Sequence, residues 1–343
     1  MKHLEDTPWW ICDKDDVNYC AYMDTDSVYL TAEPLLLHLY PDFEDKNDED
    51  KDNILEKVAL KYQGIITEYY DTLAKNCFNS YNHRLDMKTE AVIRTAYFRA
   101  TRRYAQWITK QEGRSLVNYA KIKPKENSGH HIGYNVNYHE EIGTGLEEGT
   151  LDIKGLEFMK ANFPPILGKF FNHILEQVLK GEKHDKILIQ IKDFKQQILT
   201  GAISITKLGN PTRVTKLEKY SGRSARAGEM FTVIEKGAPA PVRAAIRYND
   251  LLKFWQLDKK HNYITQSDKI KWVYMQNNPY KIEALGFLEY DIPDKIQEFM
   301  EKYVDRQKIF DSILLNKLEG FFGDLEWSLD LNPHKGAFTF FDI

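Results

Sequence analysis

Residues 17–31 have the sequence VNYCAYMDTDSVYLT. Two runs rich in β-branched and aromatic residues, 17–22 and 27–31, predict two strands joined by a tight turn. The turn carries two carboxylates, Asp24 and Asp26, one residue apart. At a hairpin tip these carboxylates can approach a common point, where they repel each other unless a cation joins them. The pattern indicates a Mg²⁺ site suited to phosphoryl chemistry, and an ordinary Asp-rich turn is the alternative.

The composition is that of a soluble globular protein with room for two domains. The chain has 343 residues, of which 42% are hydrophobic and 29% charged. No apolar run approaches the length of a membrane span, so no membrane partner is expected. The three cysteines, Cys12, Cys20 and Cys77, lack metal-ligand spacing. They are expected to be reduced thiols in a cytoplasmic protein, and the cytoplasm would be that of the host cell if the protein is viral.

The formal net charge of -4 does not by itself indicate a nucleic-acid-binding protein, but the charges are unevenly distributed. Residues 42–52 are mostly acidic and lack the spacing of an EF-hand, which favours a solvated loop. Residues 84–125 carry Lys or Arg at eleven positions against Asp or Glu at three, with aromatic residues interleaved. This mixture suits a nucleic-acid backbone, and a solvated sheet face above buried aromatics is the alternative.

Hydrophobic periodicity predicts the remaining elements. A helix over residues 54–77 is followed by strands over 84–93 and 104–108, and the second half of the chain is mostly helical. Pro164 and Pro165 mark one helix start, and Gly181 marks its end. The expected helices of that half cover 166–180, 184–199, 241–255 and 294–322, with a small β excursion over 269–275 and 283–289.

Three short motifs resemble those of family B DNA polymerases, in the order that family has them. Residues 22–27 resemble the palm motif Tyr-Gly-Asp-Thr-Asp-Ser, with Met23 in place of the usual Gly. Residues 102–104, Arg-Arg-Tyr, resemble the Lys-x-Tyr motif that contacts the primer–template duplex; Arg for Lys keeps the charge and changes its geometry. Residues 154–157, Lys-Gly-Leu-Glu, resemble the Lys-Gly-x-Glu signature between palm and thumb.

The resemblance covers essentially the whole chain, and it is to the C-terminal portion of such polymerases, closest to the T-even phage type. It implies an α+β fold in which residues 1–150 form part of a palm, with an antiparallel sheet and helices. Residues 151–330 would form a mostly helical thumb, and 331–343 a flexible tail. The proofreading nuclease, the second catalytic Asp and the fingers have no counterpart. This implies a split polymerase whose N-terminal chain is a partner, and a truncated polymerase is the alternative.

The resemblance also implies the chemistry and its residues. Two Mg²⁺ ions roughly 3.5–4 Å apart would be shared between Asp26 and an Asp of the partner chain. Asp24 would be a weaker ligand or an electrostatic support, and Glu90 is a further candidate near the metals. The substrates would be primer–template DNA and a dNTP. The residues expected to contact DNA are Arg102, Arg103, Tyr104, Lys154 and Gly155.

The C-terminal residues GAFTFFDI resemble the clamp-binding peptide of T-even-type polymerases. Phe338, Phe340, Phe341 and Ile343 would bind a sliding clamp; the alternative is that they pack into the thumb's own core. Two rival functions also remain. One is a non-catalytic DNA-binding or processivity subunit with a relic palm site, and the other is a different palm nucleotidyltransferase such as a primase or transcriptase.

Overall fold

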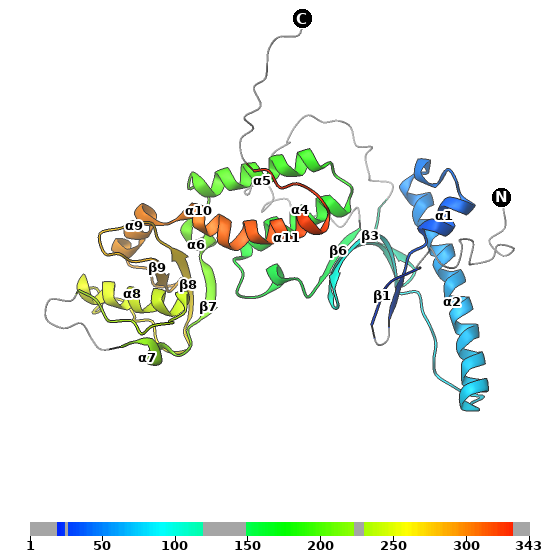
Figure 1. Cartoon of the computed structure of the whole chain (residues 1–343), viewed down its shortest axis with the longest axis horizontal. Helices are drawn as coiled ribbons and strands as arrows, with labels where there is room; N and C mark the ends of the chain where they lie inside the picture. The colour runs from blue at the N-terminus through cyan, green and yellow to red at the C-terminus, as the bar shows by residue number, and fades with distance from the viewer. Residues whose placement is uncertain (1–18, 25–26, 119–148, 223–229, 332–343) are drawn as a thin grey trace, which may run out of the picture. The chain divides into compact units, whose positions relative to one another are not determined.

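The computed structural model describes residues 19–24, 27–118, 149–222 and 230–331. Its helices and antiparallel sheets give the expected mixed α+β fold (Figure 1). The chain divides into two compact units, the first ending at Gly155 and the second beginning at Leu156. The sequence predicted this boundary at residue 150. In the structure that residue begins strand β6 (Thr150–Lys154), which belongs to the sheet of the first unit. Within these described ranges no helix is long and apolar enough to cross a bilayer.

The first unit is built on an antiparallel sheet whose central strand is β4 (Arg103–Gln111). β3 (Ala91–Ala100) pairs with one edge of β4, and β6 and the short β5 (Arg114–Ser115) pair with the other. Six successive residues of β4, from Ala105 to Lys110, are buried. Continuous burial of both faces is expected of a central strand that is covered on each side.

The strand predicted over 84–93 begins only at Ala91, so most of that prediction is wrong. Residues 83–89 instead return along helix α2 (Asp48–Phe78) and bond to it. The His83 ring lies 2.8 Å from the Asp71 carboxylate, and the Thr89 N–H donates to the Gln63 side chain at 2.8 Å. These long-range partners replace a strand neighbour for the segment.

The acidic stretch 42–52 is not the solvated loop that its composition predicted. It forms a 3₁₀ turn (Phe43–Asp45) and the first turn of α2, where Asn47 caps the helix by accepting from the Asp50 N–H at 2.9 Å. Carboxylates in a first helical turn face the positive end of the helix dipole, which favours them there. Asp52 is fully buried, the opposite of the prediction.

Asp52 is buried because α2 packs on the sheet through ion pairs. The Arg94 guanidinium lies 2.9 Å from Asp52 and 3.0 Å from Asp48. Burial acts to lower the pKa of Arg94, but the two carboxylates hold it above its ordinary value. Lys110 pairs with Glu56 at 2.6 Å on the same interface. Two cations of the basic stretch 84–125 are therefore structural and do not face a ligand.

Two further elements complete the first unit. The predicted hairpin is present, with strands β1 (Cys20–Met23) and β2 (Val28–Leu30) that are shorter than expected. Helix α1 (Glu33–Leu39) packs on the first half of α2, where Leu35, Leu36 and Val58 form a small apolar core.

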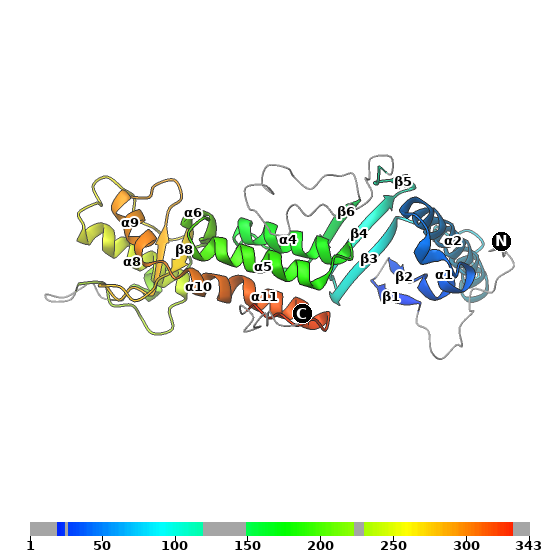
Figure 2. The same ribbon diagram turned by 90° about the horizontal axis from the view of Figure 1, so that it is seen from above.

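The second unit combines a helical layer with a three-stranded sheet. The predicted helices 166–180 and 184–199 are confirmed as α4 (Pro165–Leu179) and α5 (His184–Leu199), joined by the stacked rings of Phe170 and Phe194 at 3.9 Å. The helices α4 and α5 run side by side (Figure 2). The sheet has the order β7-β8-β9 and packs against α8 (Figure 1). After α5, the second unit contains α6 (Ile205–Leu208), β7 (Asn210–Arg213), α7 (Leu217–Tyr220), α8 (Ala240–Phe254), β8 (Lys269–Tyr274), β9 (Ala284–Phe287), α9 (Asp294–Tyr303), α10 (Arg306–Ile309), a π-helical turn (Phe310–Leu315) and α11 (Asn316–Asp324).

The predicted helix 294–322 is interrupted after Tyr303. Val304 forms an isolated bridge with Met275, and the Asp305 N–H donates to the carbonyl of Tyr274 at 2.9 Å. The chain leaves the helix here because its backbone hydrogen-bonds to the end of β8.

Removing the charge of Asp52 should destabilise the first unit. Asp52→Asn puts a neutral amide at a fully buried position and leaves the half-buried Arg94 guanidinium with one charged partner fewer. We expect a loss of about 3 kcal/mol in the free energy of unfolding. Asp48→Asn is the matched control, because Asp48 binds the same arginine from a half-exposed position and should cost less than about 1 kcal/mol. Urea denaturation followed by circular dichroism measures both, and equal losses would contradict the buried ion pair.

Candidate nucleic-acid interface

Two aromatic pairs hold the hairpin on the sheet of the first unit. Tyr22 is paired with Tyr29 across β1 and β2, and Phe98 is paired with Tyr104 across β3 and β4. All six combinations of these four rings have centroids 5.4–5.6 Å apart. Cross-strand aromatic pairs stabilise each ladder, and here each pair also covers the other. We call these four residues the aromatic tetrad.

A hydrogen bond fixes the tetrad more closely. The Tyr29 hydroxyl donates to the Tyr104 hydroxyl at 3.0 Å. Burial raises the pKa of Tyr29, and the hydrogen bond with Tyr104 and the charge of Asp152 raise it further. Tyr29 therefore stays protonated and remains a donor through the neutral pH range. The tetrad thus fixes where the tip of the hairpin lies against the sheet.

The turn between β3 and β4 lies against that tip. Ala100 pairs with Arg103, which leaves Thr101 and Arg102 as a two-residue loop, and Arg102 has a left-handed φ of 59°. Its backbone N–H donates to the Tyr22 hydroxyl at 3.0 Å. Its side chain donates to both oxygens of Asp24, from Nε at 3.0 Å and from Nη2 at 3.4 Å. Asp24, which was expected to bind metal, and Arg102, which was expected to bind DNA, therefore form an ion pair with each other.

The end of β6 completes the cluster. Lys154 is paired with Tyr104 in the sheet, and its ammonium lies 3.4 Å from the Asp152 carboxylate. Gly155 has a φ of 62°, and a Cβ on it would lie 2.1 Å from the carbonyl oxygen of Arg102. Only glycine fits this approach without moving the turn. Lys154 therefore pairs with the strand that follows the Arg102 turn, and Gly155 makes room for the carbonyl of that turn. The sequence did not reveal this packing.

The predicted DNA-contacting residues thus gather at one end of one sheet, whereas Asp24 and Glu90, two of the predicted metal ligands, do not lie together. Glu90 precedes β3 and Arg102 follows it, and a strand of ten residues spans roughly 30 Å. Asp26 lies outside the described residues. In the part of the chain that is described, no group of three His, Cys, Asp or Glu side chains could hold a metal ion. Asp24 and its described neighbours do not by themselves make a Mg²⁺ site.

The chemistry of the cluster suits a phosphate backbone. The side chains of Arg102 and Lys154 are 73% and 58% exposed, so both cations can reach a ligand. Arg103 is exposed beside them. Guanidinium and ammonium groups of this kind bind phosphate oxygens by charge-assisted hydrogen bonds.

Sequence reasoning missed three members of this site. Tyr29 and Phe98 anchor the hairpin, and Asp152 holds both Lys154 and the Gln106 amide, the latter at 2.9 Å. The two rings had a signal in the sequence. Tyr29 lies in the predicted strand 27–31, and Phe98 is one of the aromatic residues interleaved in the basic stretch 84–125. Asp152 had none, since its hydrogen bond with Gln106 joins two strands that are 46 positions apart in the sequence.

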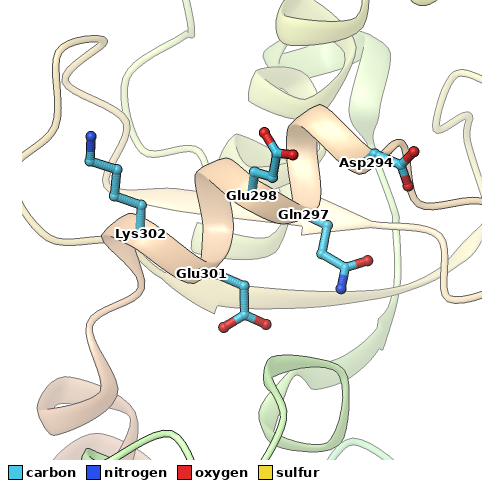
Figure 3. A pocket seen from close by; sticks show the side chains of 5 residues that line it. All are labelled: Asp294, Gln297, Glu298, Glu301 and Lys302. Carbon is cyan, nitrogen blue, oxygen red and sulfur yellow. The ribbon is translucent and has the colours of Figure 1, made fainter.

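A pocket in the second unit has the opposite character. Figure 3 shows its lining side chains, which all come from α9. They are Asp294, Gln297, Glu298, Glu301 and Lys302. Three carboxylates against one ammonium repel a phosphate backbone, so this surface is not a candidate for DNA contact.

The predicted clamp-binding residues, Phe338, Phe340, Phe341 and Ile343, lie outside the described residues. Comparisons with protein-family models and with curated proteins find no match to this chain. Its function is therefore argued from the residues and geometry above.

The raised pKa of Tyr29 makes a prediction about stability at high pH. A tyrosine whose pKa is higher in the folded state stabilises the fold fully below its ordinary pKa of about 10, and this contribution is lost as the pH rises above that value. Tyr29→Phe should therefore show a smaller loss of stability between pH 9 and 11 than the unmodified chain, although it loses about 1 kcal/mol at pH 7 with its hydrogen bond.

Urea denaturation at a series of pH values measures this difference. Tyr81→Phe, which removes an exposed hydroxyl, is the control and should follow the unmodified chain. An identical decline in Tyr29→Phe would contradict the raised pKa of Tyr29.

Proposed function

We propose that this chain is the palm–thumb part of a DNA-directed DNA polymerase and that the cluster around Asp24 grips primer–template DNA. One observation carries the proposal. Three segments that resemble successive motifs of family B polymerases, and that span more than 130 positions of the sequence, meet at one end of one sheet. They are the hairpin tip at Asp24, the turn from Arg102 to Tyr104, and Lys154 with Gly155.

In this proposal the cluster positions the duplex and does not read its sequence. Arg102, Arg103 and Lys154 would bind backbone phosphates, which fix register and carry no base information. The second unit has further exposed cations around β7 and α7, namely Lys207, Arg213, Lys216 and Lys219. Arg223 and Arg226, which belong to the same basic stretch of sequence, lie outside the described residues.

Catalysis in this proposal needs a second chain. Asp24 would be joined by Asp26 and by a carboxylate of that chain to hold the Mg²⁺ ions, which activate the primer hydroxyl and the dNTP when bound. The same partner would supply the fingers and the proofreading nuclease. Contact with a sliding clamp through the C-terminal phenylalanines stays a prediction.

A second candidate is a non-catalytic subunit that binds duplex DNA. It is favoured by the ion pair of Asp24, because both carboxylate oxygens accept hydrogen bonds from Arg102. Such a chain would share the duplex grip and differ only in the fate of Asp24 and Asp26.

Primer extension with a second chain that carries the N-terminal nuclease, palm and fingers motifs tests the proposal. The chain alone should bind the duplex and add no nucleotide, and the mixture should extend the primer. Asp26→Asn should abolish extension and leave duplex affinity nearly unchanged, because it removes a metal ligand and little else. Asp24→Asn should reduce extension less.

Four outcomes would contradict parts of this account. A chain that binds no duplex rules out both candidates, and one that extends primers alone rules out the need for a partner. Full activity of Asp26→Asn would refute its role, and duplex binding without extension in any mixture would favour the non-catalytic subunit.

A further inference from the structure

The Arg102 side chain has one fork of donors and two rival acceptors. Its Nε and Nη2 donate to the two oxygens of Asp24, the bidentate geometry that a guanidinium also uses toward phosphate. A carboxylate and a phosphate cannot both occupy that edge of the guanidinium. Binding of a DNA phosphate in this geometry therefore requires the ion pair with Asp24 to open.

The backbone of Arg102 is held in a conformation that aims this fork at the hairpin. A φ of 59° is strained for a residue with a Cβ, and it persists where the surroundings enforce it. Here the Tyr22 hydroxyl accepts from the Arg102 N–H, and the missing side chain of Gly155 leaves room for the Arg102 carbonyl. The anchor points are backbone atoms, so the side chain can exchange partners while the turn stays fixed.

The exposure of the two partners favours such an exchange. The Arg102 side chain is 73% exposed, whereas that of Asp24 is 27% exposed. An ion pair with so exposed a member contributes little stability, because water screens it. Binding to a DNA phosphate is favoured further, because each phosphate that is neutralised releases condensed counterions.

We propose that Asp24 is a positioning residue for Arg102. It holds the guanidinium fork at the hairpin tip in the free protein and gives it up to a backbone phosphate when duplex DNA binds. The exchange rests on the proposed duplex grip and adds its regulation: the Asp24 carboxylate becomes available to a cation only when DNA is present. Free chain and DNA-bound chain would then differ in which partner Arg102 has.

A double-mutant cycle on duplex affinity tests the exchange without any catalysis. The probe is a fluorescently labelled primer–template duplex, and its binding to the full chain is measured by anisotropy in EDTA at fixed low salt. Asp24→Asn keeps the shape of the side chain and removes its charge, so a phosphate no longer has to displace a carboxylate from Arg102. We expect affinity to rise about two- to fivefold, the factor that an exposed ion pair represents.

The second arm removes the arginine. Arg102→Ala should weaken binding and flatten the dependence of log affinity on log salt by about one. Asp24→Asn added to Arg102→Ala should then give no further gain. Added to Lys154→Ala, which weakens binding through another cation, it should still give its full gain.

Two controls separate this from general electrostatics and from misfolding. Glu112→Gln removes one exposed carboxylate at the other end of the β3–β4 hairpin and should change affinity less than Asp24→Asn. Thermal melting by circular dichroism checks that each variant is folded. An unchanged or weaker affinity of Asp24→Asn, or an equal gain in the Arg102→Ala background, would overturn the exchange and leave the duplex grip standing. Failure of the unmodified chain to bind duplex would overturn the proposed function itself, and the exchange with it.

Discussion

The site depends on the contact between two aromatic pairs. A two-stranded hairpin is only marginally stable by itself, and β1 and β2 pair with no other strand among the described residues. The rings of Tyr22 and Tyr29 bind it to Phe98 and Tyr104, with every centroid distance between 5.4 and 5.6 Å. Everything at the tip follows from this contact, including the reach of Asp24 to the Arg102 turn.

The positive charges of the first unit divide into two sets with different roles. Arg94 and Lys110 form ion pairs with carboxylates of α2 and so bind that helix to the sheet. Arg102 and Lys154 lie at the end of the sheet and are more than half exposed. Removing the first set should therefore affect folding, and removing the second should affect ligand binding.

Local patterns predicted the fold where contacts are local. Helix α5 (His184–Leu199) follows its apolar periodicity residue for residue, and the hairpin was expected from its strands and turn. The predictions of a strand over 84–93 and of a solvated loop over 42–52 are wrong because the partners of these segments are remote in the sequence. Asp52, for example, is buried against Arg94, which lies 42 positions later. At the candidate site, the motifs singled out Arg102 and Lys154, whereas the ion pair with Asp24 depends on a turn conformation that no motif encodes.

Hydrogen–deuterium exchange of the full chain, with and without a primer–template duplex, tests the central claim most directly. The claim is that one end of one sheet, formed by the Asp24 hairpin, the Arg102 turn and the end of β6, is the duplex-binding surface of the first unit. The account predicts that duplex slows exchange in peptides covering 98–105 and 150–156 and leaves those of α2 unchanged. Protection of α2 or of the acidic helix α9, with none at the Arg102 turn, would contradict it.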